Sequence, residues 1–464
     1  MAKILSIIAV FIVVSIVACM HTNAAEMSEE EYVRLKNRLT SEFMQKLKDE
    51  IKNELVAELK SEYTIEPKQK QEDKQKSQNV ASRPAIETQP SDYRETHEAT
   101  DKSKAESTEE DELKLDAARY KLGEGLTFGE QMLKIKGFGN VDASYSDNHI
   151  GKSANQEGNA FFSMGEFDLF ITSQLSNRIS ILGETVFEFE STGEVTPDLE
   201  RVLIHYDVNS LLKIDVGKFH TPIGYWNRLY HHGEWLQTTV ERPEILKFED
   251  HGGPLPAHNA GIQLSGSAML EGFDLNYFFT VSNGRGIDTT NQQNMGDLND
   301  KKAFSFQLEA VPHSIVEGLR FGPTVYYDSI PEDETNPNRA NEIRELIYGG
   351  HVVYSLKNVE FLMETFEINH DEFSGGVFNT FGGYAQGSYS IGKFKPYYRY
   401  DYINYDSKDP FYSESEFDFL DTNMHTVGLR YELSQFNALK CEVSHGVFDD
   451  EDANIIRLQT AFSF

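Results

Sequence analysis

The sequence has little of what a helical membrane protein or a disulfide-stabilised protein needs. Only one long apolar run occurs, from Ile4 to Ala18, which excludes a bundle of membrane-spanning helices. The chain has 2 cysteines, Cys19 and Cys441, and needs no intrachain disulfide. Cations are also scarce, since 43 Lys and Arg face 75 Asp and Glu and give a formal net charge of −32. So acidic a surface makes nucleic acid a poor partner.

A secretory signal is expected at the N-terminus. Lys3 precedes the apolar run and the small residues of Thr22–Ala25 follow it, which is the order of charge, apolar core and cleavage site in a signal peptide. We expect the signal peptide to span residues 1–25, with cleavage after Ala24 or Ala25. Residues 16–19, which end in Cys19, also fit the pattern at which bacteria cut and lipidate a cysteine. An acylated N-terminus therefore stays an open alternative.

Residues 26–63 are predicted to form an amphipathic helix. Large apolar residues recur three or four positions apart, with no Gly or Pro between them. They are Tyr32, Leu35, Leu39, Phe43, Leu47, Ile51, Leu55 and Leu59. Because most steps are four residues, the stripe winds around the helix and favours an oligomeric, coiled-coil-like arm. Residues 64–125, which are rich in Lys, Gln, Glu, Ser and Pro, are predicted to be a flexible linker.

From about Leu133 the apolar period changes to two, which is typical of strands with one apolar and one polar face. Near the C-terminus, Ile456 and Leu458 alternate with Arg457 and Gln459. The same alternation recurs around residues 180–190 and 426–433. We therefore predict an all-β domain over residues 126–464.

The connections between these strands alternate in length, which favours a transmembrane barrel over a soluble sandwich. About sixteen antiparallel strands are expected, each long enough to cross a bilayer when tilted. Tight turns alternate with long loops, of which the longest runs from His220 to His258 and the last from Phe448 to Asp452. Short turns at one rim, long loops at the other and an even strand number are features of bacterial outer-membrane barrels. Aromatic girdles are expected at Tyr326–Tyr327, Tyr397–Tyr398 and Tyr400–Tyr402.

The last strand carries an independent indication. Phe464 ends the chain, and Phe462 and other apolar residues occupy every second position before it. This pattern resembles the C-terminal recognition signal of bacterial outer-membrane proteins. It implies assembly by the outer-membrane barrel-assembly machinery, with the barrel in outer-membrane lipid and the helical arm in the periplasm.

The longest loop and its flanking strands carry a family resemblance. Gly217–Trp226 contains a Gly-x-Phe-x-x-Pro turn, Thr239–Glu244 contains a Glu-Arg pair before a bend, and Gly261–Gly266 re-enters the sheet. This order resembles the phosphate-selective porin O and P family, and the helical arm looks like that of dicarboxylate-type trimeric porins. The resemblance implies a homotrimeric channel for passive diffusion of small anionic solutes. It also implies that the longest loop folds into the lumen and narrows it.

Two groups of side chains are the candidate functional residues. Predicted inward positions on the strands are mixed in sign, so selectivity depends on the field at the narrowest ring. The pore-lining candidates are Arg201, His205, Arg320, Lys395, Arg399, Arg457, Glu184, Glu188 and Glu364. The candidates in the constriction loop are His220, Tyr225, Trp226, Arg228, His231, His232, Glu241 and Arg242.

Other functions stay open as alternatives. Five histidines in and beside the longest loop suggest a transition-metal site, but their spacing is not that of a tight ligand set, and we predict neither metal nor cofactor. An outer-membrane hydrolase would need a nucleophile aligned with His and an acid, and no local signature for it is present. A structural tether or adhesin would use the arm to reach peptidoglycan, which is compatible with a pore.

Overall fold

The computed structural model describes residues 119–121, 125–128, 133–148, 150, 160–189, 195–230, 233–289, 296–373, 375–415 and 417–464. The predicted signal peptide and helical arm, and the linker up to residue 118, lie outside these residues. Two short strands, β1 (Arg119–Lys121) and β2 (Gly125–Phe128), precede the barrel strands in the chain and pair with each other, and β2 also pairs with the first barrel strand. In the described ranges, no helix has the length and apolar character needed to cross a membrane.

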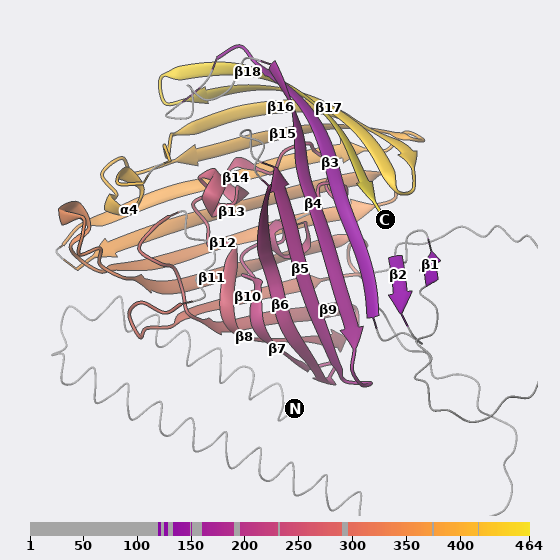
Figure 1. The fold of residues 1–464 in the computed structure, drawn as a ribbon, viewed down its shortest axis with the longest axis horizontal. Helices are drawn as coiled ribbons and strands as arrows, with labels where there is room; N and C mark the ends of the chain where they lie inside the picture. The colour runs from indigo at the N-terminus through magenta and orange to yellow at the C-terminus, as the bar shows by residue number, and fades with distance from the viewer. Residues whose placement is uncertain are drawn as a thin grey trace, which may run out of the picture. The chain divides into compact units, whose positions relative to one another are not determined.

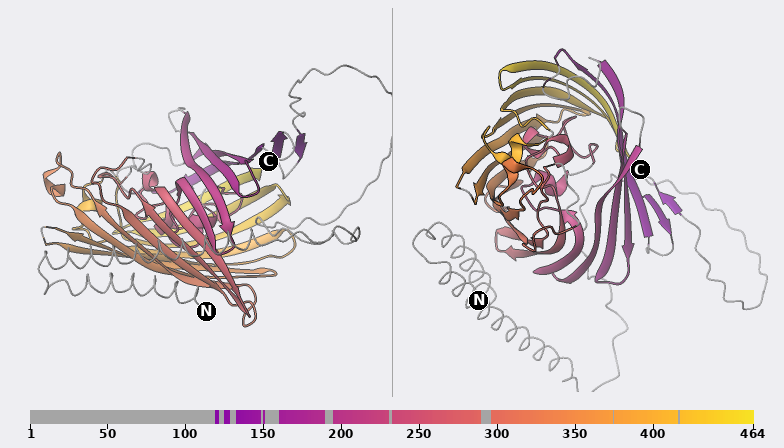
Figure 2. Two further views of the ribbon diagram at one scale, coloured as in Figure 1. Left: turned by 90° about the horizontal axis from the view of Figure 1, so that it is seen from below. Right: turned by 60° about the vertical axis from the view of Figure 1, so that its left-hand side comes forward.

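Sixteen antiparallel strands form a closed barrel, which confirms the predicted fold class and strand number (Figure 1). Each strand pairs with the next along the chain, and the last pairs with the first, for example Ile456 with Tyr145. Figure 2 shows the strands as a ring in its right-hand view. The strands are β3 (Leu133–Ser146), β4 (Ala160–Gln174), β5 (Ile179–Phe189), β6 (Val195–Asn209), β7 (Leu212–His220), β8 (His258–Leu270), β9 (Phe273–Ser282), β10 (Ala303–Val311), β11 (Leu319–Ile330), β12 (Ile343–Leu356), β13 (Val359–Glu372), β14 (Val377–Tyr389), β15 (Phe394–Asn404), β16 (Thr422–Ser434), β17 (Asn437–Phe448) and β18 (Glu451–Ser463).

Side chains alternate between the two faces of the wall as the period of two predicts. On β18, Ile456 and Leu458 are 44% and 54% exposed, whereas Gln459 and Ala461, which follow on the opposite face, are buried. The outward apolar band and the inward polar positions are the pattern of a barrel surrounded by lipid. The two faces are therefore suited to different solvents.

Connections at the two ends of the barrel differ in length. At the short-turn end, β6 and β7 are separated by two residues, and so are β8 and β9. At the long-loop end the connection between β7 and β8 spans residues 221–257 and is the longest. The predicted long connection at 448–452 is wrong, because β17 and β18 are joined by a two-residue turn in which Asp449 has a φ of 50°.

The predicted aromatic girdle is only partly present. Tyr398 and Tyr402 point outward and are exposed. Tyr326 and Tyr397 are buried inside the barrel, so their assignment to the girdle was wrong. Because neighbouring residues in a strand face opposite sides, only one tyrosine of each adjacent pair can reach the lipid interface.

The C-terminal residue closes the barrel against the first strand. The backbone groups of Phe464 exchange hydrogen bonds of 3.0 and 3.1 Å with Gly137, and the Phe464 ring stacks on Phe167 with centroids 5.6 Å apart. A Cβ atom at Gly137 would lie 2.3 Å from the Phe464 ring and 2.7 Å from the carbonyl oxygen of Asp168. Glycine is therefore required there for the ring to cover the seam.

Candidate pore and constriction loop

The loop of residues 221–257, called the constriction loop here, folds into the lumen and packs against one side of the wall. It contains α3 (Trp226–Leu229) and two short 3-10 turns, η3 (Glu244–Leu246) and η4 (Glu249–His251). Its apolar side chains join inward residues of β10–β15 in a single buried cluster. The members are Ile223, Tyr225, Trp226, Ile245, Leu246, Leu255, Ala303, Tyr326, Ile347, Val353, Leu362, Phe366, Ile368, Tyr384 and Ile403. Much of the lumen on this side is thus a packed core.

Glu364, a predicted pore-lining residue on β13, holds the start of α3. Its carboxylate accepts hydrogen bonds from the backbone N–H groups of Tyr225 and Trp226, at 2.5 and 2.8 Å, and from the Tyr384 hydroxyl at 2.9 Å. Its side chain has no exposed surface. A buried carboxylate is tolerated because hydrogen bonds of this kind replace its hydration. Glu364 therefore points into the barrel but is covered by the loop and does not face open lumen.

Charged side chains of β15–β17 bind the backbone of the rest of the loop. Arg399, Arg430 and Lys440 donate to loop carbonyl oxygens, while Asp401 and Glu442 accept from loop N–H groups. The contacts are Arg399 to the Glu241 oxygen (2.6 Å), Arg430 to the Trp235 and Gln237 oxygens (both 2.7 Å), Lys440 to the Thr239 oxygen (2.8 Å), the Glu244 nitrogen to Asp401 (3.1 Å) and the Val240 nitrogen to Glu442 (3.0 Å). Because backbone groups are bonded at so many points, the loop is a fixed part of the barrel interior.

Most of the predicted pore-lining cations lie in ion pairs on the inner wall. Lys395 contacts Glu360 at 3.0 Å, Arg320 contacts Glu309 at 3.4 Å, and Arg399 contacts Asp401 at 2.7 Å. Arg457 pairs with Glu241 of the loop at 2.9 Å and with Glu442 at 3.5 Å. His205 Nδ1 lies 2.6 Å from Asp215, and Glu188 lies half-buried on β5. Among these, Arg399 is fully buried beneath the loop and cannot meet a solute there.

A β-bulge on β6 brings two adjacent charged residues to the inner face. Arg201 pairs in register with Glu184 and Leu199 pairs with Thr185, so Glu200 is an extra residue between them. Leu199 and Val202 both point outward, whereas Glu200 is buried beside His258. Arg201 forms an ion pair with Glu184. Strict alternation would have placed Glu200 on the outer face, which is why the sequence did not reveal it.

The predicted constriction-loop residues have different surroundings. Tyr225 and Trp226 are buried in the apolar cluster. Arg242 lies 3.7 Å from the centroid of the Phe248 ring, and its burial lowers the pKa of its guanidinium to about 10. Burial alone would raise the pKa of Glu241, but Arg457 and neighbouring cations reverse this and hold it below its usual value.

The histidines of this region do not form a recognisable metal site where the structure describes them. His220 ends β7, and its Nε2 lies 3.7 Å from Glu184. His231 and His232 lie outside the described residues. Within the part of the chain that is described, no group of three or more His, Cys, Asp or Glu side chains is arranged to hold a metal ion.

On the opposite side, residues of α3 and of the wall formed by β3–β9 enclose a solvent-filled space. A cavity of about 520 Å³ lies in the short-turn half of this space. Arg201 on β6, Asp215 on β7 and Arg228 on α3 contribute charged groups to its lining, and His205 on β6 contributes an imidazole. The arrangement has the features of a solute path, with a polar wall on one side and the fixed loop on the other.

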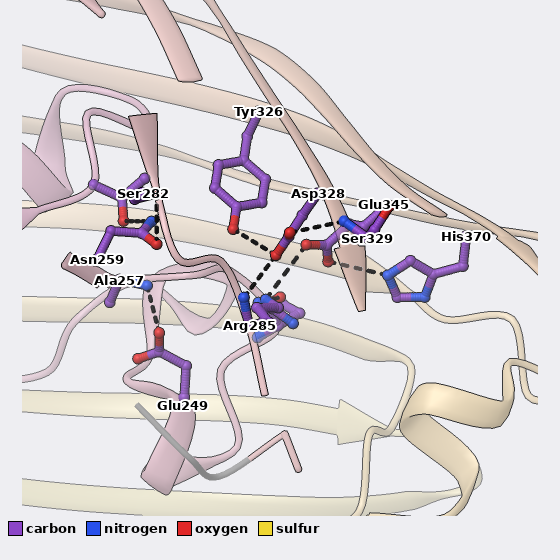
Figure 3. Close-up of polar contacts among 12 residues, drawn as sticks. Glu249, Ala257, Asn259, Ser282, Arg285, Tyr326, Asp328, Ser329, Glu345 and His370 are labelled. Carbon is purple, nitrogen blue, oxygen red and sulfur yellow. Dashed lines mark hydrogen bonds and ion pairs between the residues drawn. The ribbon is translucent and has the colours of Figure 1, made fainter. Parts of the chain in front are cut away.

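A second polar network at the long-loop end was not anticipated from the sequence (Figure 3). His370 on β13 lies 3.0 Å from Glu345 on β12 and 2.6 Å from Asp409, which caps α4 (Pro410–Ser413). The backbone N–H of Arg285 donates to Asp328 at 2.6 Å, and its guanidinium lies 3.4 Å from Glu345. These contacts tie the loops after β9 and β15 to the barrel. Nothing in the sequence showed that these residues meet.

The constriction loop also reaches this network, because the guanidinium of Arg285 donates to the backbone oxygen of Pro254. The backbone N–H of Ala257 donates to Glu249 at 2.6 Å. Burial raises the pKa of Glu249, and this effect outweighs the opposing ones of His258 and Arg285. The returning end of the loop is thus bonded to a buried carboxyl of the loop itself, whereas its starting end is held by Glu364 of the wall.

Comparisons with known proteins identify the fold. The chain matches no protein-family model and no curated protein. Among solved structures, it is similar to an anion-selective porin from Comamonas acidovorans, with 10% identity, a TM-score of 0.51, and coverage of 72% of this chain and 99% of that chain. Further matches are OmpF of Salmonella typhi and the outer membrane channel DcaP of Acinetobacter baumannii. Both are 10% identical and cover 72% of this chain and 97% of theirs, with TM-scores of 0.49 and 0.48. The barrel therefore has a porin-like fold.

Proposed function

We propose that this chain is an outer-membrane porin through which small hydrophilic solutes diffuse passively. The observation that carries the proposal is the constriction loop, which is bonded to one wall of a closed barrel and leaves a charged space along the other. A polar wall replaces part of the hydration that a solute would lose in hydrocarbon, so it lowers the barrier to crossing without an energy source.

We further propose a preference for anions. Arg228 and Arg320 both contact Glu309, so two guanidinium groups share a single carboxylate. Glu309 is buried, whereas Arg320 is about half exposed. Cations are thus presented to a solute while the compensating carboxylate lies behind them. The solved structure with the highest TM-score among those named above is described as an anion-selective porin, which is consistent with this preference.

We also propose a location, an oligomeric state and a route of assembly for the protein. The barrel would lie in outer-membrane lipid as a homotrimer after assembly by the barrel-assembly machinery, with Phe464 in the recognition signal. The helical arm would lie in the periplasm, where it could support the trimer or reach peptidoglycan. Chemical crosslinking of the purified full-length protein would test the trimer, since it predicts a product three times the mass of the chain.

Swelling of proteoliposomes tests the channel itself. Liposomes that contain the folded protein should swell in isotonic solutions of small sugars, at rates that fall steeply as the sugar becomes larger. Protein-free liposomes and liposomes with heat-unfolded protein are the controls. Swelling no faster than in these controls, with an intact barrel, would contradict the proposed function.

A further inference from the structure

The cavity between α3 and β3–β9 combines cationic and apolar groups in a way that a simple water-filled path does not require. Its volume of about 520 Å³ falls within the range of small-molecule binding sites. Leu182, Leu203 and Phe278 contribute apolar surface, and Arg201, Arg228 and Lys134 contribute positive charge. A hydrated inorganic ion gains nothing from the apolar part. An organic anion can use both parts.

The two arginines are held in fixed positions with donors to spare. The guanidinium of Arg228 lies 4.4 Å from the centroid of the Phe278 ring, and its Nη2 lies 3.0 Å from Glu309. The guanidinium of Arg201 lies 5.4 Å from the Phe170 centroid and pairs with Glu184. A guanidinium has five N–H donors, so a single carboxylate cannot use all of them. Its planar form also suits simultaneous contact with a carboxylate and a ring.

The exposure of the paired groups decides which charge a solute meets. The Arg228 and Arg201 side chains are 19% and 22% exposed, whereas Glu309 and Glu184 are at most 1% exposed. Among the lining residues that the structure describes, Asp215 is the one carboxylate, and it already accepts from Gln263 at 3.0 Å and contacts His205 at 2.6 Å. Among the charged groups of the described lining, those still available to a solute are therefore mainly guanidinium donors, and they lie beside apolar surface.

We propose that this cavity is a transient binding site for amphiphilic organic anions, such as small aromatic carboxylates. The solute carboxylate accepts from a guanidinium of Arg228 or Arg201, and the hydrocarbon body lies against Phe278 and Leu182. The site rests on the proposed porin function and refines it, because it makes transport of such anions saturable rather than simply proportional to concentration. Acetate has a carboxylate but no ring, so it can contact only the guanidinium groups. Benzyl alcohol has a ring but no charge, so it can contact only the apolar side chains.

The test is binding of benzoate to the folded full-length protein, measured by calorimetric titration in detergent and compared with acetate and benzyl alcohol. We expect benzoate to bind at least about tenfold more tightly than either, since loss of a charge-assisted hydrogen bond or of the apolar contact costs an amount of that order. R228Q should weaken benzoate binding about tenfold. R344Q is the matched control, because Arg344 pairs with Asp371 on the outer side of the wall and does not line the cavity.

The outcomes separate this site from the proposed function. Equal binding of benzoate and acetate, or equal binding by the wild type and R228Q, would overturn the site even if the protein conducts ions. Benzoate binding that R228Q weakens would support the site even if liposomes do not swell, and the porin function alone would then fail. If R228Q does not fold, the test uses R201Q, which should likewise weaken benzoate binding. Chloride should also compete with benzoate for the wild-type protein, and the absence of both effects would overturn the site.

Discussion

Replacement of Glu364 with alanine is expected to detach the start of the constriction loop while leaving the barrel closed. The change removes the acceptor for two buried backbone N–H groups, those of Tyr225 and Trp226, and for the Tyr384 hydroxyl. Each unsatisfied buried donor costs about 1–3 kcal/mol, so the two backbone groups together cost roughly 2–6 kcal/mol. Since about 1.4 kcal/mol changes an equilibrium tenfold, the detached population should rise at least about twentyfold.

Two assays detect this release. Trypsin should cut after Arg228 in E364A, because a protease cannot reach α3 while it is packed in the lumen. Single-channel currents should become larger or noisier, because the narrowing segment moves. E367A is the control, since Glu367 lies three residues along the same strand on the opposite face. If E364A folds into a barrel yet shows wild-type currents and no cleavage after Arg228, the reasoning is refuted.

Three further predictions follow from the same structure. The pKa of Glu241 is lowered in the folded protein, so its ion pair with Arg457 stabilises the loop fully above the usual carboxyl pKa of 4.5. This stabilisation is lost as the pH falls through the lower pKa of the folded state. Current noise should therefore rise below pH 4.5, and E241Q should weaken that pH dependence. G137A should lower the free energy of unfolding, measured in urea, by about 1–3 kcal/mol, because its methyl group would meet the Phe464 ring. G387A is the control: a methyl group there meets open space and should change the free energy of unfolding by less than about 0.5 kcal/mol. F411A removes a fully buried ring and should lower the local free energy of unfolding by about 3–5 kcal/mol. Amide hydrogen exchange should therefore speed up in residues 405–421. Unchanged exchange would contradict the claim that the Phe411 ring stabilises this loop.

The barrel was predictable from the sequence because two strong signals agree. Strand alternation is fixed by the requirement that one face meets lipid and the other meets polar groups, and it is readable in segments such as residues 456–461. Loop lengths then distinguish a barrel from a sandwich. The exceptions are local: the extra residue at Glu200 and the two-residue turn before β18 both interrupt a regular count.

The interior was less predictable, because it depends on contacts between segments far apart in the chain. Glu364 and Arg399 were assigned to the inner face from alternation alone, but only the structure shows that they bind the constriction loop. The same holds for His370, Glu345 and Asp409, whose meeting depends on the register of three elements. A sequence pattern gives the face on which a residue lies and not the segment that covers it.

Reconstitution of the full-length protein in planar bilayers under a salt gradient tests the central claim most directly. The account predicts stepwise ohmic currents, grouped in threes, with a reversal potential that reports a preference for anions. Current steps in groups of three with a reversal potential that reports a preference for cations would contradict the proposed selectivity, although the protein would still be a channel. The absence of current steps from protein that is folded and inserted would contradict the claim that the space beside the constriction loop is an open path.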